Sequence, residues 1–189
     1  MFEAIIDRAV CGWADGGVIA EEDKDIYVYG LGLVLFSALN LLAIFITAAI
    51  TGKVLESLLL VSVTIPLQML GGGYHARTHL NCFLIMYVGW WIVMWLAPLI
   101  SFFVSIAVVT SSVTVVFWLA PVANENVPMS EGQRKKMKGI VRIFAVIIAA
   151  AAIILSEAFF GTQIIGGLIT AGLGSVAISM LANKIRILC

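Results

Sequence analysis

The sequence predicts an all-α, polytopic membrane protein with six transmembrane helices and an amphipathic helix at its N-terminus. Its 189 residues are 62% hydrophobic and 12% charged, and the mean hydropathy is +1.10. These values lie far outside the range of soluble globular domains. Apolar runs approaching the roughly 20 residues that a spanning helix needs account for most of the chain. We therefore expect one integral membrane domain over residues 1–189.

The six apolar runs fall into pairs along the chain. Only three residues separate the first run from the second, a connection so short that the two helices must form an antiparallel hairpin. Pro98 separates the third run from the fourth, and a polar segment precedes the fifth. The expected spans are residues 26–50, 54–70, 82–97, 101–120, 140–157 and 161–182.

Residues 1–25 precede the first span and carry apolar side chains at the three- and four-residue spacing of one helix face. The charged residues Glu3, Asp7 and Arg8 lie off this face, and Gly16-Gly17 would end the helix. The pattern predicts a helix lying at the membrane interface. It would serve as an anchor or as a docking surface for a substrate.

The distribution of basic residues predicts the orientation of the chain. All but one of the 11 Lys and Arg residues fall on the same side of the six-helix arrangement, and the exception is Lys53. Short loops on the cytoplasmic side retain Lys and Arg. We therefore expect both termini, a basic loop at residues 121–139 and residues 71–82 to face the cytoplasm.

Residues 71–82, GGGYHARTHLNC, place two histidines and a cysteine after three glycines. Ionisable groups in or near a bilayer are costly and usually functional. In one reading, Cys82 attacks a carbonyl as a thiolate, stabilised by the start of the third span, and His75 transfers the proton. Seven residues of straight helix would hold these side chains about 10 Å apart. This reading therefore requires residues 71–82 to form a catalytic hinge, and Gly71, Gly72 and Gly73 provide the freedom for the bend.

Three other readings stay open from spacing alone. If the segment is helical, His75, His79 and Cys82 occupy one face at a spacing suited to zinc, although no HExxH base accompanies them. The chain could instead be a small-peptide transporter, or the segment could be an interfacial loop without chemistry. The balanced net charge suggests no nucleic-acid partner.

The run GGGYHA, followed by Cys82 seven residues after His75, resembles the signature of the accessory gene regulator B family. Members of that family are membrane endopeptidases that process quorum-sensing propeptides. The similarity continues in the polar segment APVANEN at residues 120–126, in Pro128 and in the basic cluster at residues 134–138. Six spans agree as well, so the resemblance covers nearly the whole chain.

The resemblance implies a multi-pass protein of the bacterial cell membrane that uses no metal or cofactor and that could form a homodimer. His75 and Cys82 would be the base and the nucleophile that cut a propeptide on its C-terminal side. The thioester on Cys82 would then be displaced by a thiol or hydroxyl of the same peptide, which closes a thiolactone or lactone ring. The substrate would have an amphipathic start and an acidic tail.

Supporting roles follow from the same comparison. Many relatives carry an arginine before the glycines, where this chain has the neutral Gln68, which could still donate to an oxyanion. If catalysis needs the positive charge that the arginine of those relatives supplies, Arg77 would provide it in this chain. Thr78 and Asn81 are candidates for orienting His75, and Asn81 could also cap the helix. An electrostatic dock for the acidic tail, or a simple cytoplasmic retention signal, would come from Arg134, Lys135, Lys136 and Lys138.

Overall fold

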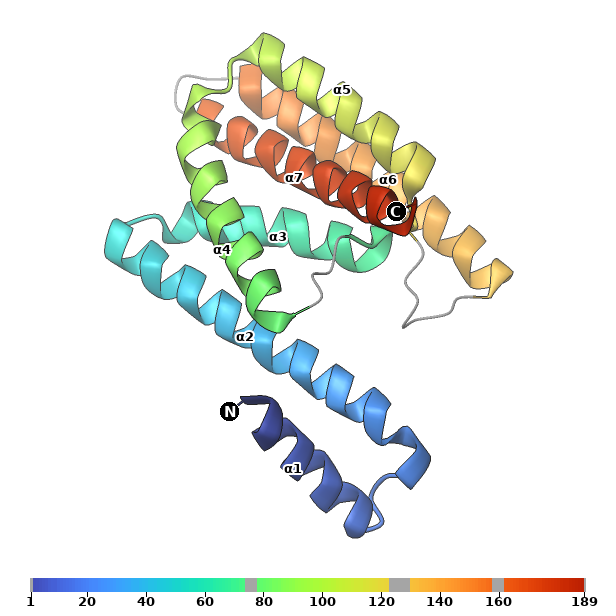
Figure 1. The fold of residues 1–189 in the computed structure, drawn as a ribbon. Coiled ribbons are helices and arrows are strands. Elements are labelled where there is room, and N and C mark those ends of the chain that lie inside the picture. The colour runs from blue at the N-terminus through green and yellow to red at the C-terminus, as the bar shows by residue number, and fades with distance from the viewer. Residues whose placement is uncertain (1, 74–77, 123–129, 158–161, 189) are drawn as a thin grey trace. The chain divides into compact units, whose positions relative to one another are not determined.

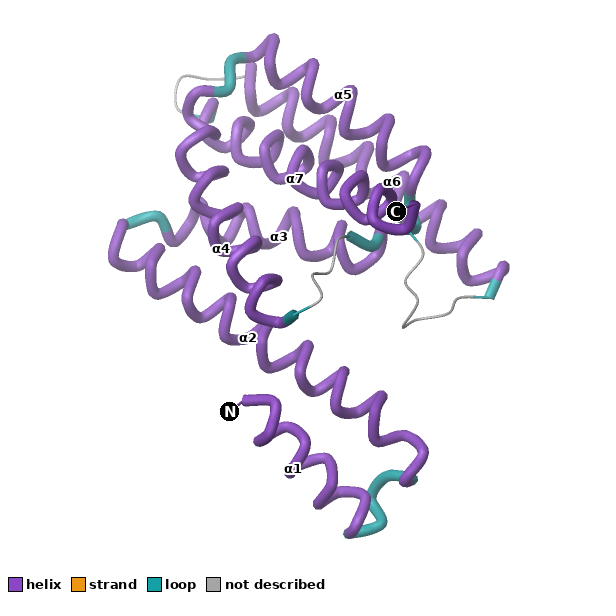
Figure 2. Tube along the Cα trace, viewed as in Figure 1, coloured by secondary structure: helices purple, strands orange, loops and turns teal. Residues whose placement is uncertain are grey.

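The computed structural model describes residues 2–73, 78–122, 130–157 and 162–188 (Figure 1). Over these residues every regular element is a helix, and Figure 2 shows only turns and loops between them. The all-α prediction is confirmed. The elements are α1 (Phe2–Asp15), the 3-10 turn η1 (Glu21–Asp23), α2 (Lys24–Thr51), α3 (Val54–Gly71), α4 (His79–Leu96), the 3-10 turn η2 (Ala97–Leu99), α5 (Phe102–Leu119), α6 (Glu131–Glu157) and α7 (Gln163–Leu188).

Six of the described helices are long and apolar enough to cross a membrane, and they correspond to the six predicted spans. A helix satisfies its own backbone hydrogen bonds, which lipid cannot do. The protein is therefore a multi-pass membrane protein.

The largest departure from the expected spans is at α6, which begins at Glu131 rather than near residue 140. Ser130 and Gln133 form a capping box. The Gln133 N–H donates to Ser130 Oγ at 3.3 Å, and the Ser130 N–H donates to Gln133 Oε1 at 3.0 Å. The basic cluster thus lies on the first turns of a helix. The prediction of a loop over residues 121–139 is wrong for residues 131–139, which belong to α6.

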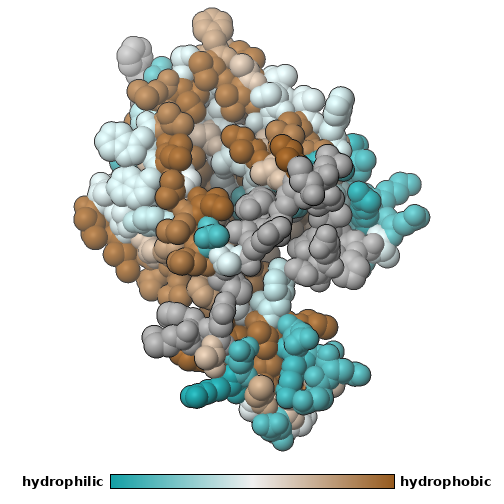
Figure 3. Space-filling view, in the orientation of Figure 1, coloured by the Kyte–Doolittle hydropathy of each residue, from teal (hydrophilic) through white to brown (hydrophobic). Residues whose placement is uncertain are grey.

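The N-terminal helix is shorter than the predicted segment 1–25. α1 ends at Asp15, and a turn follows in which Gly17 has a φ of +69° and the Val18 N–H donates to the Trp13 carbonyl at 2.8 Å. Ile6 and Val10 are buried, whereas Ile5 and Trp13 are exposed. Hydrophilic residues gather around α1 and η1 (Figure 3). An interfacial position for α1 stays a prediction.

The described chain divides into two compact units. The first comprises Met1–Thr47 and Ala76–Tyr87, and the second comprises Ala48–His75 and Val88–Cys189. The expectation of one integral domain is not tested by this division and stays a prediction.

In the first unit, side-chain hydrogen bonds join α2 to the beginning of α4. Asn40 Nδ2 donates to the Phe83 carbonyl at 3.1 Å, and the hydroxyls of Thr47 and Tyr87 are 2.8 Å apart. Residue numbers rise along both helices from one bond to the next. The two segments therefore run in the same direction, as expected for the first and third of consecutive membrane spans (Figure 1).

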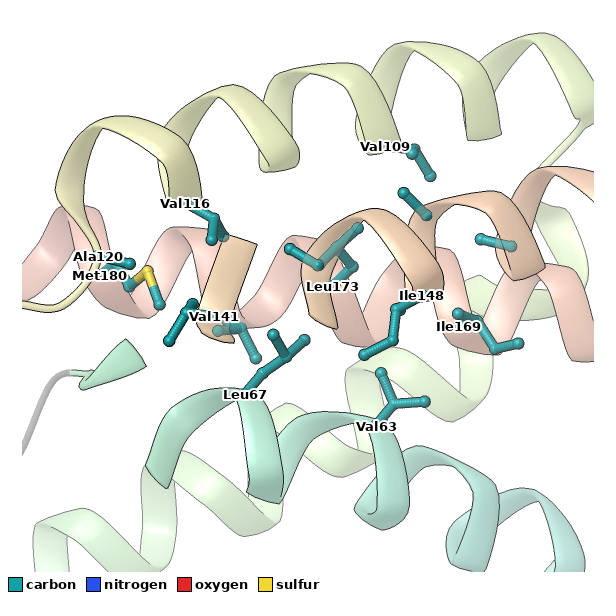
Figure 4. Packing of buried hydrophobic residues seen from close by; sticks show 14 of the residues in the cluster. Val63, Leu67, Val109, Val116, Ala120, Val141, Ile148, Ile169, Leu173 and Met180 are labelled. Carbon is teal, nitrogen blue, oxygen red and sulfur yellow. The ribbon is translucent and has the colours of Figure 1, made fainter. Parts of the chain in front are cut away.

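The second unit contains the main hydrophobic core. α5, α6 and α7 pack against one another, and α3 packs against α6 and α7 (Figure 1). Figure 4 shows side chains from all four helices meeting in this core. Its fully buried residues include Leu67 of α3, Val116 of α5, Val141 of α6, and Leu173 and Met180 of α7.

Small residues allow α7 to approach its neighbours closely. A Cβ atom at Gly166 would meet the backbone of Ser156, with the Ser156 N only 2.5 Å away, and one at Gly167 would overlap the Ala97 carbonyl oxygen. At Gly172 it would lie 3.0 Å from Leu60 Cδ1. The small residues of this span are therefore used by helices of the same chain, and they no longer support the predicted homodimer.

Buried hydroxyl groups add polar ties across the same unit. Ser105 Oγ lies 3.1 Å from Ser156 Oγ, and Thr170 Oγ1 donates to Ser105 Oγ at 3.3 Å, so one cluster joins α5, α6 and α7. Hydrogen bonds of this kind between membrane helices contribute roughly 0.6 kcal/mol each.

We expect Gly167→Ala to destabilise the protein by about 1–3 kcal/mol, because the added methyl group would displace the Ala97 backbone. The measurement is thermal unfolding in detergent. Gly89→Ala is the matched control, since a Cβ at Gly89 meets nothing within 4 Å. Equal stability of the two variants would contradict the close approach at Gly167.

Candidate active site

The segment between α3 and α4 begins with a tightly defined glycine turn. α3 ends at Gly71, and the Gly72 N–H donates to the Gln68 carbonyl at 2.9 Å. Gly72 has φ +75° and ψ 166°, a backbone conformation that is essentially restricted to glycine. The helix therefore stops here for a local conformational reason.

The glycine turn is also packed too closely for side chains. A Cβ at Gly71 would collide with Met180 Cε, one at Gly72 would lie 3.0 Å from the Val122 carbonyl oxygen, and one at Gly73 would lie 2.8 Å from Ser179 Oγ. The Val122 N–H donates to the Gly71 carbonyl at 2.9 Å. The sequence suggests that these glycines supply freedom, but the structure shows that they fit a restricted space beside α7 and the segment after α5.

Thr78 caps the start of α4. Its hydroxyl accepts from the Asn81 N–H at 3.3 Å, and its carbonyl accepts from the Cys82 N–H at 3.1 Å. The expectation that Asn81 caps this helix is therefore wrong, since Thr78 does so. Asn81 is exposed, and Cys82 is partly buried in the first turn, where the positive end of the helix dipole favours an anion.

The described helices on either side of the predicted hinge are separate. α3 ends at Gly71 and α4 begins at His79, so no unbroken helix carries both position 75 and position 82. The zinc reading needs His75, His79 and Cys82 on one helix, and it stays untested because His75 is not among the described residues. His75 and Arg77 lie outside the described residues, and the pairing of His75 with Cys82 stays a prediction.

Metal ligands do not gather elsewhere in the part of the chain that the structure describes. Within those ranges, no group of three His, Cys, Asp or Glu residues lies close enough together to hold a metal ion. Because His75 falls outside them, this observation does not test a zinc site that uses it.

The remaining predicted residues lie at two places. Gln68 is half-buried in the last turn of α3, and its Cγ is 3.8 Å from the Cβ position of Gly73. Arg134, Lys135 and Lys136 are exposed on the first turns of α6, and Lys138 is half-buried. The start of α6 accordingly forms a hydrophilic surface in Figure 3.

Two polar residues near these elements were missed by the sequence reasoning. Asn40 is 3% exposed on α2 and bonds to the Phe83 carbonyl, next to Cys82. Arg142 Nη2 donates to the Phe117 carbonyl at 2.7 Å, and its guanidinium carbon lies 4.9 Å from the Phe117 ring centroid. Their position inside apolar runs was the signal that could have identified both.

These elements define a class of protein, namely a multi-pass membrane protein with a glycine turn, a capped helix that carries a cysteine in its first turn, and a basic helix start. A family model described as "Accessory gene regulator B" matches residues 14–180. The chain therefore belongs to the accessory gene regulator B family, which is involved in processing quorum-sensing peptides. Neither the curated proteins nor the solved structures contain a match to it.

The contact at Gly73 predicts a pair of compensating substitutions. Gly73→Ala should reduce peptide processing, because its methyl group would press on Ser179 Oγ, and Ser179→Gly should restore part of the loss by removing that atom. The measurement is the rate of product formation for both single variants and the double variant. Additive losses in the double variant would contradict this packing.

Proposed function

We propose that this protein is a membrane-embedded cysteine endopeptidase that cleaves a quorum-sensing propeptide on its C-terminal side and promotes its cyclisation. Family membership supports a peptide-processing role. The observation that carries the finer proposal is the break between α3 and α4, which starts a new, capped helix just before Cys82. A thiol there benefits from the helix dipole, and it is not tied to position 75 by one rigid helix.

In the proposed first step, the Cys82 thiolate attacks the carbonyl carbon of the scissile peptide bond, and the C–N bond breaks. His75 takes the thiol proton and gives it to the leaving amine. The products are a thioester between Cys82 and the N-terminal part of the peptide, and a released C-terminal tail.

In the second step, a thiol or hydroxyl within the bound peptide attacks the thioester carbonyl. His75 accepts the proton of that group, the new ring bond forms, and Cys82 leaves as the thiolate. A nucleophile held in the same peptide has a large effective concentration over any external competitor. Exclusion of water from a membrane site protects the thioester from hydrolysis to a linear product.

The orientation proposed for this reaction places both termini, the glycine turn and the start of α6 at the cytoplasmic face of a bacterial cell membrane. The basic residues on α6 would bind the acidic tail of the propeptide and hold the scissile bond near Cys82. Because Arg134, Lys135 and Lys136 are exposed, this attraction is screened by salt. Cleavage and cyclisation require no metal or cofactor in this proposal.

Cys82→Ser and His75→Ala should each lower propeptide cleavage by about a thousandfold or more, because each removes a group that makes or breaks bonds. The measurement is mass spectrometry of a propeptide incubated with reconstituted protein. It should detect an adduct at Cys82 and a ring product lighter by one water than the linear fragment.

His79→Ala is the control for these two variants and should retain most activity. A chelator should have no effect, whereas alkylation of Cys82 should inactivate the protein. Undiminished cleavage by Cys82→Ser would refute the proposal, and chelator sensitivity together with an essential His79 would favour the zinc alternative. Transport of uncleaved peptide by Cys82→Ala would favour the transporter.

Replacing Arg134, Lys135 and Lys136 together by Gln should weaken binding of an acidic-tailed propeptide roughly tenfold, since three exposed ion pairs contribute about 0.5 kcal/mol each. Binding to the wild-type protein should also weaken as salt is raised. Lys53→Gln, on the α2–α3 connection, is the control and should bind normally. A salt-independent dissociation constant would contradict the docking role.

A further inference from the structure

Asn40 is a buried amide in the middle of an apolar helix. It is 3% exposed, and its Nδ2 donates to the Phe83 carbonyl at 3.1 Å. Phe83 directly follows Cys82, and all three residues belong to the same compact unit. Asn40 therefore bonds to the residue that directly follows the cysteine.

The hydrogen bond also determines which way the amide points. A carbonyl oxygen can only accept, so the atom facing Phe83 must be the Nδ2 donor. Asn40 Oδ1 is then the other end, and it is buried without a hydrogen-bond partner among the described residues. An unsatisfied buried acceptor destabilises the folded protein.

A hydrogen bond that only joins α2 to α4 does not need to leave a buried acceptor unsatisfied. The hydroxyl pair of Thr47 and Tyr87 joins the same two helices further along, and neither is an amide with a second polar atom to satisfy. Polar groups that are expensive in a membrane are usually functional. The location of the amide beside the first turns of α4 indicates what it serves.

The Phe83 carbonyl is a second attachment point for the start of α4. Within an α-helix this oxygen already accepts the N–H four residues later, and its remaining lone pair can receive Asn40 Nδ2. Thr78 caps the N-terminal end of α4 by a local hydrogen bond. Asn40 joins the same end of α4 to α2, and this bond fixes the depth and rotation of α4 relative to α2. Both constraints act on the turn that contains Cys82.

We propose that Asn40 is a positioning residue for Cys82, which holds the first turns of α4 so that the sulfur is presented in one orientation. This inference rests on the proposed function, in which Cys82 is the nucleophile. Misplacement of a reacting atom by about 1 Å can cost a hundredfold in rate. Loss of Asn40 should therefore lower kcat rather than raise KM.

Asn40→Leu is the main test, because leucine has a similar size and removes both the donor and the stranded acceptor, so stability should change little. We expect kcat for propeptide cleavage to fall between about tenfold and a hundredfold, with KM nearly unchanged. Asn40→Gln keeps an amide donor and should retain more activity than Asn40→Leu. Thermal unfolding in detergent checks that each variant is folded.

Thr47→Val is the matched control, since it removes the hydrogen bond between Thr47 of α2 and Tyr87 of α4 and should leave kcat within about twofold. A second readout is the rate of Cys82 alkylation against pH, measured with Cys11 and Cys189 replaced by Ser. Asn40→Leu should change this profile, and Thr47→Val should not.

The outcomes separate the two proposals. If Cys82→Ser is inactive but folded Asn40→Leu matches Thr47→Val in kcat and in alkylation, the positioning role of Asn40 is refuted and the endopeptidase stands. A rise in KM for Asn40→Leu with kcat unchanged would also refute the positioning role. If Cys82→Ser cleaves normally, the proposed function itself fails. Should Asn40→Leu not fold, the comparison is made with Asn40→Ala, for which the same loss in kcat is expected.

Discussion

Close approach between helix backbones is the constraint on which the second unit of this protein depends. Lipid is as apolar as the side chains it surrounds, so burial of apolar surface gives little drive for membrane helices to associate. Contacts between closely spaced backbones and a few hydrogen bonds must supply it. α7 meets this demand with Gly166, Gly167 and Gly172, each of which faces a neighbour where a larger side chain would press or collide.

The same packing reaches the candidate site. Near its end, α7 presents Ser179 and Met180 to the glycine turn, and Val122 bonds to that turn from the segment after α5. At the other end of the connection, Thr78 and Asn40 hold the start of α4. Each end is thus fixed within its own unit, the first by contacts distant in sequence and the second by the local Thr78 cap and the distant Asn40.

The sequence was sufficient for the six spans, because length and hydropathy alone determine which segments can cross lipid. It was not sufficient at the start of α6, where the cluster of positive charge is typical of a loop but the capping box of Ser130 and Gln133 begins a helix. The position of Asn40 in an apolar run marks it as unusual, but the contacts of Gly73 and Asn40 could not be read from the sequence. They depend on Ser179 and Phe83, partners that only the folded chain brings close.

Arg142 has a consequence for the depth of α6. The 27 residues of this helix extend about 40 Å, which exceeds the roughly 30 Å of a hydrocarbon core. The guanidinium binds Phe117, whose carbonyl is among the last four of α5 and has no acceptor role inside that helix. A guanidinium stays charged, so a shift of α6 by one turn along its axis would leave this charge in lipid without its hydrogen-bond partner. The turns of α6 before Arg142 therefore hold their basic residues at a fixed depth, on a helix rather than on a flexible loop.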